Sequence, residues 1–182
     1  MPLAPTLRSP ADLFRKLERE AYRTFHSKNN VHKADHFFNF CVTASSMRDY
    51  CLEYLAKNTR AERQPYYKAW AASAALVAAA EIANSSKHFV LREPRTGLLV
   101  QPATKAVRSR KSKIYDIYRN ESGQLKTILA ERSDLVVTLS DGKRLLLYAF
   151  TDEVIVYWKE FLRQAGIRIR RQPFKQLSGA DA

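Results

Sequence analysis

The sequence predicts an α+β fold: an N-terminal antiparallel helical bundle, followed by a small antiparallel β-sheet and a C-terminal helix. Three observations lead to this fold class. Apolar residues recur at helical spacing through the first half of the 182 residues. Short runs rich in β-branched and aromatic residues, separated by turn residues, begin at residue 113. A last apolar stripe at helical spacing stops at Gly166, and glycine favours helix termination.

The first helix is expected to begin at Ser9-Pro10, because serine is a favoured N-cap and proline fits the first helical position. Residues 27–30 break the helical pattern after His26 and provide the cap of the next helix. Between these limits apolar side chains recur every four residues and give the helix one face for burial: Leu13, Leu17, Ala21 and Phe25.

The second helix is expected over residues 31–57, and one of its faces is polar over several turns. An exposed helix face usually carries long charged side chains, whereas this one carries short hydrogen-bonding groups. Such groups suit a polar seam that is partly buried between helices. An exposed face that is poor in long charges is the alternative. The polar face consists of His32, Asp35, His36, Asn39, Thr43 and Ser46.

The third helix is expected to run from about Pro65 to Phe89, through a stretch rich in alanine. Two long helices joined by a short loop pack antiparallel, so the start of the second helix should lie beside the end of the third. The sequence therefore predicts a polar cluster at one end of the bundle. This cluster would consist of His32, Asp35, His36, Asn39, Glu81, Asn84, Lys87 and His88.

The second half of the chain is expected to form two hairpins and a helix. Asp141-Gly142 between two β-rich runs indicates a type I′ turn, with positive φ at both residues. Thr151 is expected to cap the last helix, and Ile167 begins an alternating pattern that suits a short strand. The expected strands are residues 113–119, 125–131, 134–139 and 143–148.

The domain organisation follows from these elements and from one change in composition. Pro94, Gly97 and Pro102 interrupt a basic stretch, as is typical of a linker. The chain is therefore expected to divide into a helical bundle (9–91), a basic linker (92–112), hairpins with the C-terminal helix (113–172) and a tail (173–182).

Positive charge is concentrated in two segments of a chain whose formal net charge is +13. Residues 92–113 carry +6 and residues 163–175 carry +5. Concentrated positive charge attracts polyanions, so the expected partner is a nucleic acid, RNA or DNA, or an acidic protein. The expected nucleic-acid-binding residues are Lys105, Arg108, Arg110, Lys111, Lys113, Arg168, Arg170 and Arg171.

Two tyrosines follow these cations in the sequence. Tyr115 and Tyr118 lie beside Lys113 and Arg119, an arrangement in which aromatic rings can stack on nucleic-acid bases. Aromatic residues in a strand more often form the core face of a small sheet, and the sequence alone favours that interpretation.

Several classes of protein and site are not expected. No apolar run is long enough to cross a membrane, and no basic segment followed by an apolar one indicates a secretory signal. Cys41 and Cys51 lack a metal-binding spacing and are expected to be reduced core thiols of a cytoplasmic protein. His32 and His36 have a spacing that can bind a metal, but the glutamate of the HExxH pattern is missing. We expect neither a metal nor a cofactor.

The segment Asn84–His88, near the end of the third predicted helix, resembles the signature of the HEPN superfamily of small helical bundles. That signature is an Arg, commonly followed by a polar residue, and then a His four to six positions on. His88 takes the place of the His and Asn84 that of the polar residue, whereas no Arg stands at residues 81–83. The resemblance covers residues 9–91 at most.

The resemblance implies an RNA-directed function, because the superfamily includes RNA-cutting toxins and defence proteins. Retained catalysis would be metal-independent RNA cleavage, with His88 as general acid or base and Lys87 or Arg48 as the cation that stabilises phosphate charge. Sites of this family are often completed across a dimer, so a homodimer is implied as well. In the alternative, His88, Asn84 and Glu81 form a hydrogen-bonded network that only holds two helices together.

Taken together, the residues and the resemblance favour a bacterial or phage-like cytoplasmic HEPN-related protein. It would bind nucleic acid through its basic segments, with RNA favoured over DNA, and its catalysis would be weak or absent. Two alternatives stay open. One is an interaction module or inhibitor that docks on an acidic protein, and the other is a metal-independent ribonuclease of toxin–antitoxin or phage-defence type.

Overall fold

The computed structural model describes residues 6–85 and 104–169. The first range holds a series of α-helices, and the second holds a three-stranded antiparallel sheet in the order β1-β2-β3, followed by a helix. This architecture confirms the predicted α+β fold class. The elements are α1 (Pro10–His26), α2 (Asn30–Tyr54), α3 (Arg60–Ala71), α4 (Ala74–Ser85), β1 (Thr104–Arg119), β2 (Leu125–Leu139), β3 (Arg144–Leu146) and α5 (Leu147–Gln164).

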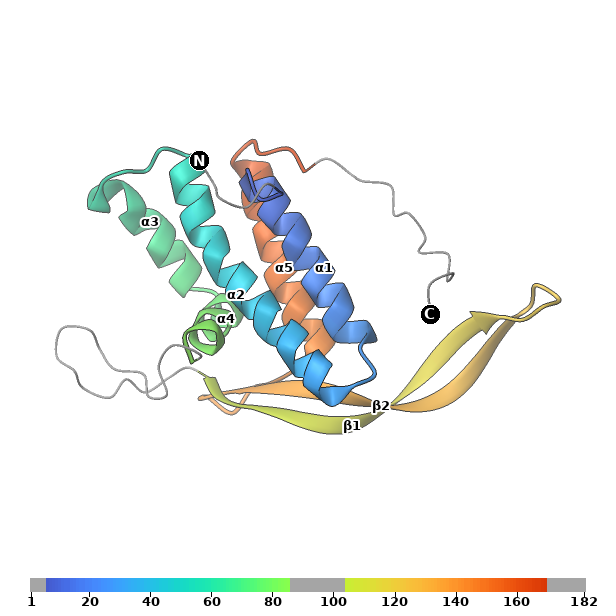
Figure 1. Ribbon diagram of the computed structural model, residues 1–182. Helices are drawn as coiled ribbons and strands as arrows, with labels where there is room; N and C mark the ends of the chain where they lie inside the picture. The colour runs from blue at the N-terminus through green and yellow to red at the C-terminus, as the bar shows by residue number, and fades with distance from the viewer. Residues whose placement is uncertain (1–5, 86–103, 170–182) are drawn as a thin grey trace.

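Three of the helices, α1, α2 and α5, stand side by side above the sheet, and α3 and α4 lie beyond α2 (Figure 1). The hairpin of β1 and β2 passes beneath the ends of these helices, and its outer part projects well past them (Figure 1). We call the hairpin, residues 104–139, the ribbon, and its outer part, residues 113–131, the arm.

The starts of the first two helices follow the predicted capping. The Ser9 side chain accepts a hydrogen bond from the backbone N–H of Asp12, and Pro10 is the first helical residue. The Asn29 side chain accepts from the backbone N–H groups of Val31 and His32. Each cap provides acceptors for N–H groups that have no partner within the helix.

The third predicted helix is in fact two helices. Thr59 and Glu62 form a capping box that begins α3 at Arg60, well before the predicted start at Pro65. The helix ends at Ala71, and Ser73 then begins α4 by accepting a hydrogen bond from the backbone N–H of Leu76 at 3.4 Å. The single long helix to Phe89 was therefore wrong, and residues 86–89 lie outside the described residues.

The sheet differs from the two separate hairpins that the sequence predicts. β2 is one continuous strand that pairs along its length with β1 and at its end with β3. β1 begins at Thr104, so residues 104–112, expected to belong to a linker, are strand. The turn at Asp141-Gly142 is present, but only Gly142 has a positive φ, at 87°, so it is not the predicted type I′ turn.

The last helix joins the bundle instead of only covering the sheet. α5 begins at Leu147, four residues before the predicted cap, and Thr151 donates its hydroxyl to the carbonyl of Leu147. The helix ends at Gln164, and Gly166, the predicted terminator, follows two residues later with a φ of 70°. Ile167, the predicted start of a strand, has no strand conformation and packs against the core.

One core unites the two halves of the chain. Phe150 of α5 contacts Phe37 and Phe40 of α2, with ring centroids 5.5 and 6.4 Å apart. Trp158 of α5 lies 5.6 Å from Trp70 of α3. Side chains of β2 complete the same cluster: Leu135, Val137 and Leu139. The base of the ribbon is thus held in the core.

Cys41 and Cys51 are free and buried, as expected. Burial raises the pKa of both thiols, that of Cys51 to about 12, so both are protonated near neutral pH. None of the helices within the described residues is both long and apolar enough to span a membrane.

Candidate nucleic-acid interface

The ribbon has two faces that carry different side chains. Successive residues of a strand alternate between faces, and residues opposite each other in the ladder share one. One face, called here the arginine face, carries Arg108, Arg110, Tyr118, Lys126, Ile128 and Arg132. The other, called the lysine face, carries Lys111, Lys113, Tyr115, Ile117, Arg119, Leu125, Leu129 and Glu131.

The five cations predicted to bind nucleic acid in the first basic segment all lie on β1, and all five are exposed: Lys105, Arg108, Arg110, Lys111 and Lys113. Acidic residues of β2 approach two of them. Arg110 lies 4.0 Å from Asp134, and Lys111 lies 3.5 Å from Glu131. Such exposed pairs contribute little to stability and are screened by salt, so they leave the strand strongly positive.

The two tyrosines of β1 are not core residues. Tyr115 is 70% exposed and Tyr118 is 43% exposed, so the interpretation that sequence alone favoured was wrong. The reason is the length of the ribbon. Its core contacts are made at the base, and the arm continues beyond the helices that would otherwise cover it (Figure 1).

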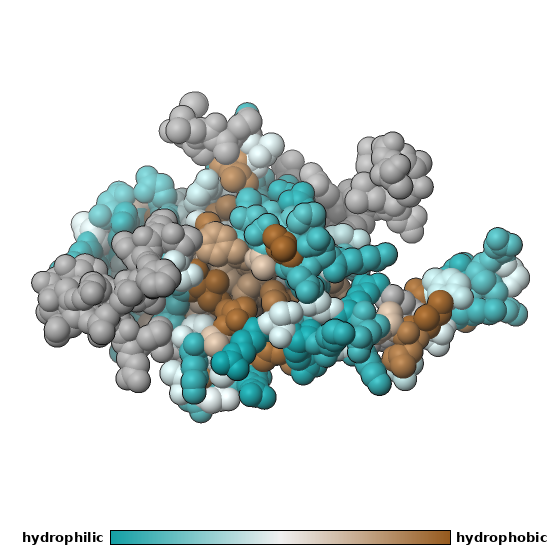
Figure 2. Space-filling model, turned by 60° about the horizontal axis from the view of Figure 1, so that its bottom comes forward, coloured by the Kyte–Doolittle hydropathy of each residue, from teal (hydrophilic) through white to brown (hydrophobic). Residues whose placement is uncertain are grey.

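Apolar side chains gather on the arm next to these tyrosines, as the space-filling view shows (Figure 2). Monomeric proteins seldom expose several large apolar side chains in one place without a function. The exposed side chains in question are Ile117, Leu125, Ile128 and Leu129. The tip of the arm is polar, because its turn is built on Asn120, which accepts from the backbone N–H of Gln124.

The predicted polar face of α2 contacts α1 instead of the third predicted helix. His36 Nδ1 lies 3.4 Å from a carboxylate oxygen of Glu20, a residue that is only 4% exposed. Lys16 and Arg23 approach the same carboxylate at 3.6 and 3.0 Å. Lys16 also donates to the Thr43 hydroxyl at 2.7 Å. A buried acid of α1 thus holds three basic groups together.

The other members of the predicted cluster that the structure describes do not contact Glu20. Glu81 accepts a hydrogen bond from the backbone N–H of Thr104 at 2.7 Å, which ties α4 to the start of β1. Asn84 is exposed. His32, Asp35 and Asn39 are exposed on α2. The single long helix that was expected to bring both groups together does not form, so His36 and Glu81 contact different elements.

The residues proposed for catalysis are only partly placed. Lys87 and His88 lie outside the described residues, so their predicted role stays a prediction. Arg48, the alternative cation, donates to the carbonyl of Leu76 at 3.3 Å and so joins α2 to α4. Burial lowers the pKa of Arg48. Of the C-terminal cations, Arg168 is exposed, and Arg170 and Arg171 lie outside the described residues.

A buried lysine closes the end of α1 beside the ribbon. Lys33 is 3% exposed and donates to the carbonyls of Thr24 and Phe25 at 2.9 and 3.2 Å. These carbonyls belong to the last turn of α1, where they lack helical partners. Burial lowers the pKa of Lys33, whereas the carboxylate of Asp134 on β2 acts in the opposite direction.

Replacing this lysine is expected to destabilise the protein. Lys33→Met keeps the aliphatic chain but removes the donor, so we expect the free energy of unfolding to fall by about 1–3 kcal/mol. Urea unfolding followed by circular dichroism measures this change. Lys28→Met, at an exposed position in the adjacent loop, is the control and should change stability by less than about 0.5 kcal/mol. Equal effects of the two changes would contradict the assigned capping role.

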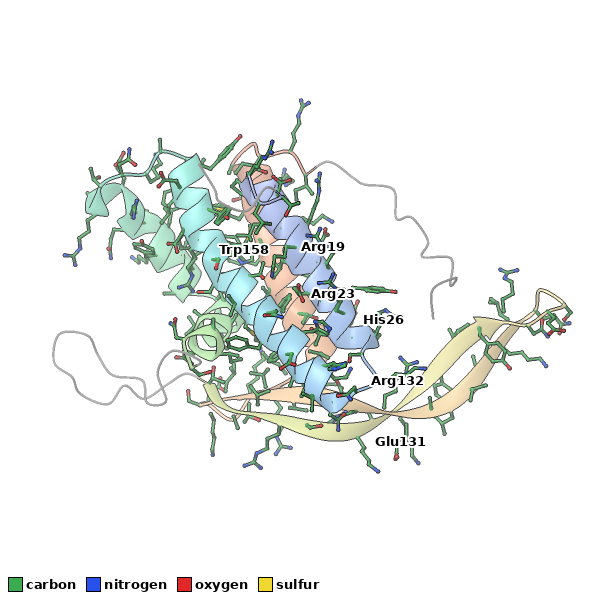
Figure 3. All side chains as sticks on the ribbon, in the orientation of Figure 1. Arg19, Arg23, His26, Glu131, Arg132 and Trp158 are labelled. Atoms are coloured by element: carbon green, nitrogen blue, oxygen red, sulfur yellow. The ribbon has the colours of Figure 1, made fainter. Side chains whose placement is uncertain are left out.

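Sequence reasoning missed a row of side chains on α1. Arg19, Arg23 and His26 follow one another down the helix toward the ribbon, where Arg132 of β2 continues the row (Figure 3). All three α1 residues are exposed. Their spacing of four and then three residues is the signal that could have revealed this shared face.

Within residues 6–85 and 104–169, no three His, Cys, Asp or Glu side chains are grouped as a metal site would require. No family model matches the chain, and no curated protein or solved structure matches it significantly.

Proposed function

We propose that this protein binds single-stranded nucleic acid, with RNA favoured, through the β1–β2 ribbon. The observation that carries the proposal is the surface of the ribbon outside the core, where exposed cations and exposed tyrosines occur together. Each kind of side chain supplies one part of the interaction, since cations attract phosphates and aromatic rings stack on bases.

The charges of β1 supply the affinity that does not depend on sequence. Residues 104–113 contain five cations and no acid. A cation that contacts a phosphate releases a condensed counterion, and this release favours binding at low salt. Because the cations project from both faces of the ribbon, a flexible strand can contact several of them at once.

The tyrosines favour a single strand over a duplex. Bases in a duplex are already stacked on each other, whereas unpaired bases can stack on an exposed ring. Tyr115 and Tyr118 lie on opposite faces of the arm and have cations next to them in the strand ladder: Lys126 is opposite Tyr118, and Lys113 is two residues from Tyr115. RNA is favoured over DNA by the resemblance of residues 9–91 to the HEPN superfamily, which we retain as a proposal.

A binding titration across ionic strength tests the proposal. Fluorescence anisotropy with a labelled RNA of about 16 nucleotides is expected to show affinity that falls as salt rises from about 50 to 200 mM. Each phosphate contact should add about 0.7 to the slope of log K against log salt. A duplex RNA of the same length should bind more weakly, because its bases are unavailable to the tyrosines.

Two results would count against this function. If the protein does not bind RNA at about 50 mM salt, the proposed nucleic-acid function is wrong. An acidic protein would then be the remaining candidate for the partner. Equal affinity for the single strand and the duplex would show that charge alone attracts RNA. Running the same samples on a denaturing gel reports whether the bound RNA is cleaved.

A further inference from the structure

The end of α1 carries an exposed group of aromatic rings that neither the core nor the ribbon accounts for. Tyr22 and His26 have ring centroids 4.1 Å apart, and Phe25 and His26 are 5.3 Å apart. Tyr148, from the first turn of α5, lies 6.2 Å from Phe25. We call these four residues the junction cluster, because they lie where α1, α5 and the ribbon meet.

The junction cluster is open to solvent. Tyr148 is 65% exposed, Tyr22 is 49% exposed and Phe25 is 43% exposed. The aromatic residues that do hold the fold behave differently, since Phe150 and Trp158, farther along α5, are fully buried. Rings grouped for packing alone would be covered in the same way, whereas these three side chains keep much of their surface exposed.

Cations surround these rings. Arg19 and Arg23 precede His26 on the same face of α1, and Arg132 of β2 lies next to the end of the helix (Figure 3). The pKa of His26 is lowered by partial burial, and further by the positive charges of Arg132 and of Lys33 on α2. An anion at this place would therefore meet a positive field with aromatic rings inside it.

We propose that the junction cluster is a second base-stacking site for the single strand that the ribbon binds, an inference that rests on the proposed function. Exposed rings bordered by cations are what a flexible polyanion with aromatic bases requires. An acidic protein would use the cations but would gain little from four grouped aromatic rings.

The arginine face of the ribbon connects the two stacking sites. Arg132 lies on the side of β2 toward α1, whereas Glu131 points to the other side (Figure 3). Tyr118 and Lys126 share the face of Arg132. Lys126 is six positions from Arg132 along β2, which is about 20 Å in a strand. A strand of several nucleotides can therefore run from the junction cluster along the arginine face to Tyr118.

The test removes two exposed rings from the cluster. Tyr22→Ala with Tyr148→Ala is expected to weaken binding of an RNA of about 16 nucleotides at least tenfold, because each lost stacking contact is a substantial part of the affinity. The matched control is Tyr54→Ala, which removes a tyrosine that is 58% exposed near the far end of α2. That control should bind RNA as the unchanged protein does.

Two further variants separate stacking from packing. The pair Tyr22→Leu and Tyr148→Leu keeps apolar bulk without an aromatic ring and should bind as weakly as the alanine pair. The pair Tyr22→Phe and Tyr148→Phe keeps both rings and should retain affinity. An oligomer of the same length that lacks bases should bind the unchanged protein and the alanine pair equally, since it has only phosphates to offer.

The outcomes distinguish the two proposals. If the unchanged protein binds RNA and the alanine and leucine pairs bind it equally well, the junction cluster is not a stacking site, and the ribbon proposal stands. If the unchanged protein does not bind RNA, both proposals fail. We expect the alanine pair to lose affinity for RNA tenfold and the phenylalanine pair to keep it. With the base-free oligomer, the difference between the alanine pair and the unchanged protein should disappear.

Discussion

Removing four cations from β1 is expected to weaken RNA binding by about a hundredfold at ~0.1 M salt. The variant replaces Arg108, Arg110, Lys111 and Lys113 with glutamine. Four lost phosphate contacts would lower the slope of log K against log salt by about 3. At ~0.1 M salt, this change alone corresponds to a binding constant that is lower by almost three orders of magnitude. The expected effect is smaller because Arg110 and Lys111 already lie near Asp134 and Glu131.

A control with the same change in net charge makes this experiment specific. Glutamine at four cations around α3 and on α5 removes equal charge from a different part of the surface: Lys57, Arg60, Lys68 and Lys159. This control should keep most of the affinity and of the salt slope. If both variants lose affinity equally, the protein attracts RNA by its overall charge, and the ribbon is not the binding surface.

The two faces of the ribbon can be tested separately in the same assay. Arg108 and Arg110 lie on the arginine face, and Lys111 and Lys113 lie on the lysine face. If the bound strand continues from the junction cluster, removing the arginine pair should cost more affinity than removing the lysine pair. The difference between the pairs therefore identifies the face that contacts RNA, whereas the four-residue variant measures the ribbon as a whole.

The fold class was predictable because the local signals agreed with the global structure. Ser9-Pro10, Asn29 and Gly166 lie at the helix ends where their capping chemistry predicts. The break between α3 and α4 was missed because alanine, a strong helix former, fills both sides of it. Ser73, which caps α4, was the one sign of the break.

The full length of β1 could not be predicted because its first half lies on the surface. Strand prediction depends on alternation between buried and exposed positions. Residues 104–112 have no buried face, so Arg108, Arg110 and Lys111 were interpreted as part of a charged linker. The charge that predicts a binding segment also concealed the strand that displays it.

Among the described residues, the predicted polar cluster does not form, for a reason of long-range geometry. The polar face of α2 was recognised, and His36 does contact a charged residue of another helix. Its partner, Glu20, lies in a segment that sequence reasoning treated only as an amphipathic helix. Periodicity identifies which face of a helix is polar, but it does not show that this face of α2 lies against α1, because α2 packs on both α1 and α4.

Replacing Trp158 with alanine is expected to lower the free energy of unfolding by about 3–5 kcal/mol. The side chain is fully buried and contacts Trp70 of α3 and Phe161 of its own helix. For a chain of this length the loss corresponds to a fall in Tm of about 10 °C. Val156→Ala, at a 55% exposed position of α5, is the control and should change the Tm only slightly.

The same variant tests whether the two halves of the chain unfold together. The protein has two tryptophans, so Trp70 is the only fluorescent indole left in Trp158→Ala, and it reports on α3. Circular dichroism reports on all helices. Because Trp158 lies between α5 and α3 in one core, both signals should change in a single transition shifted to lower temperature. A fluorescence transition separate from that of circular dichroism would show two independent units, and the arm would then belong to a module that unfolds without the bundle.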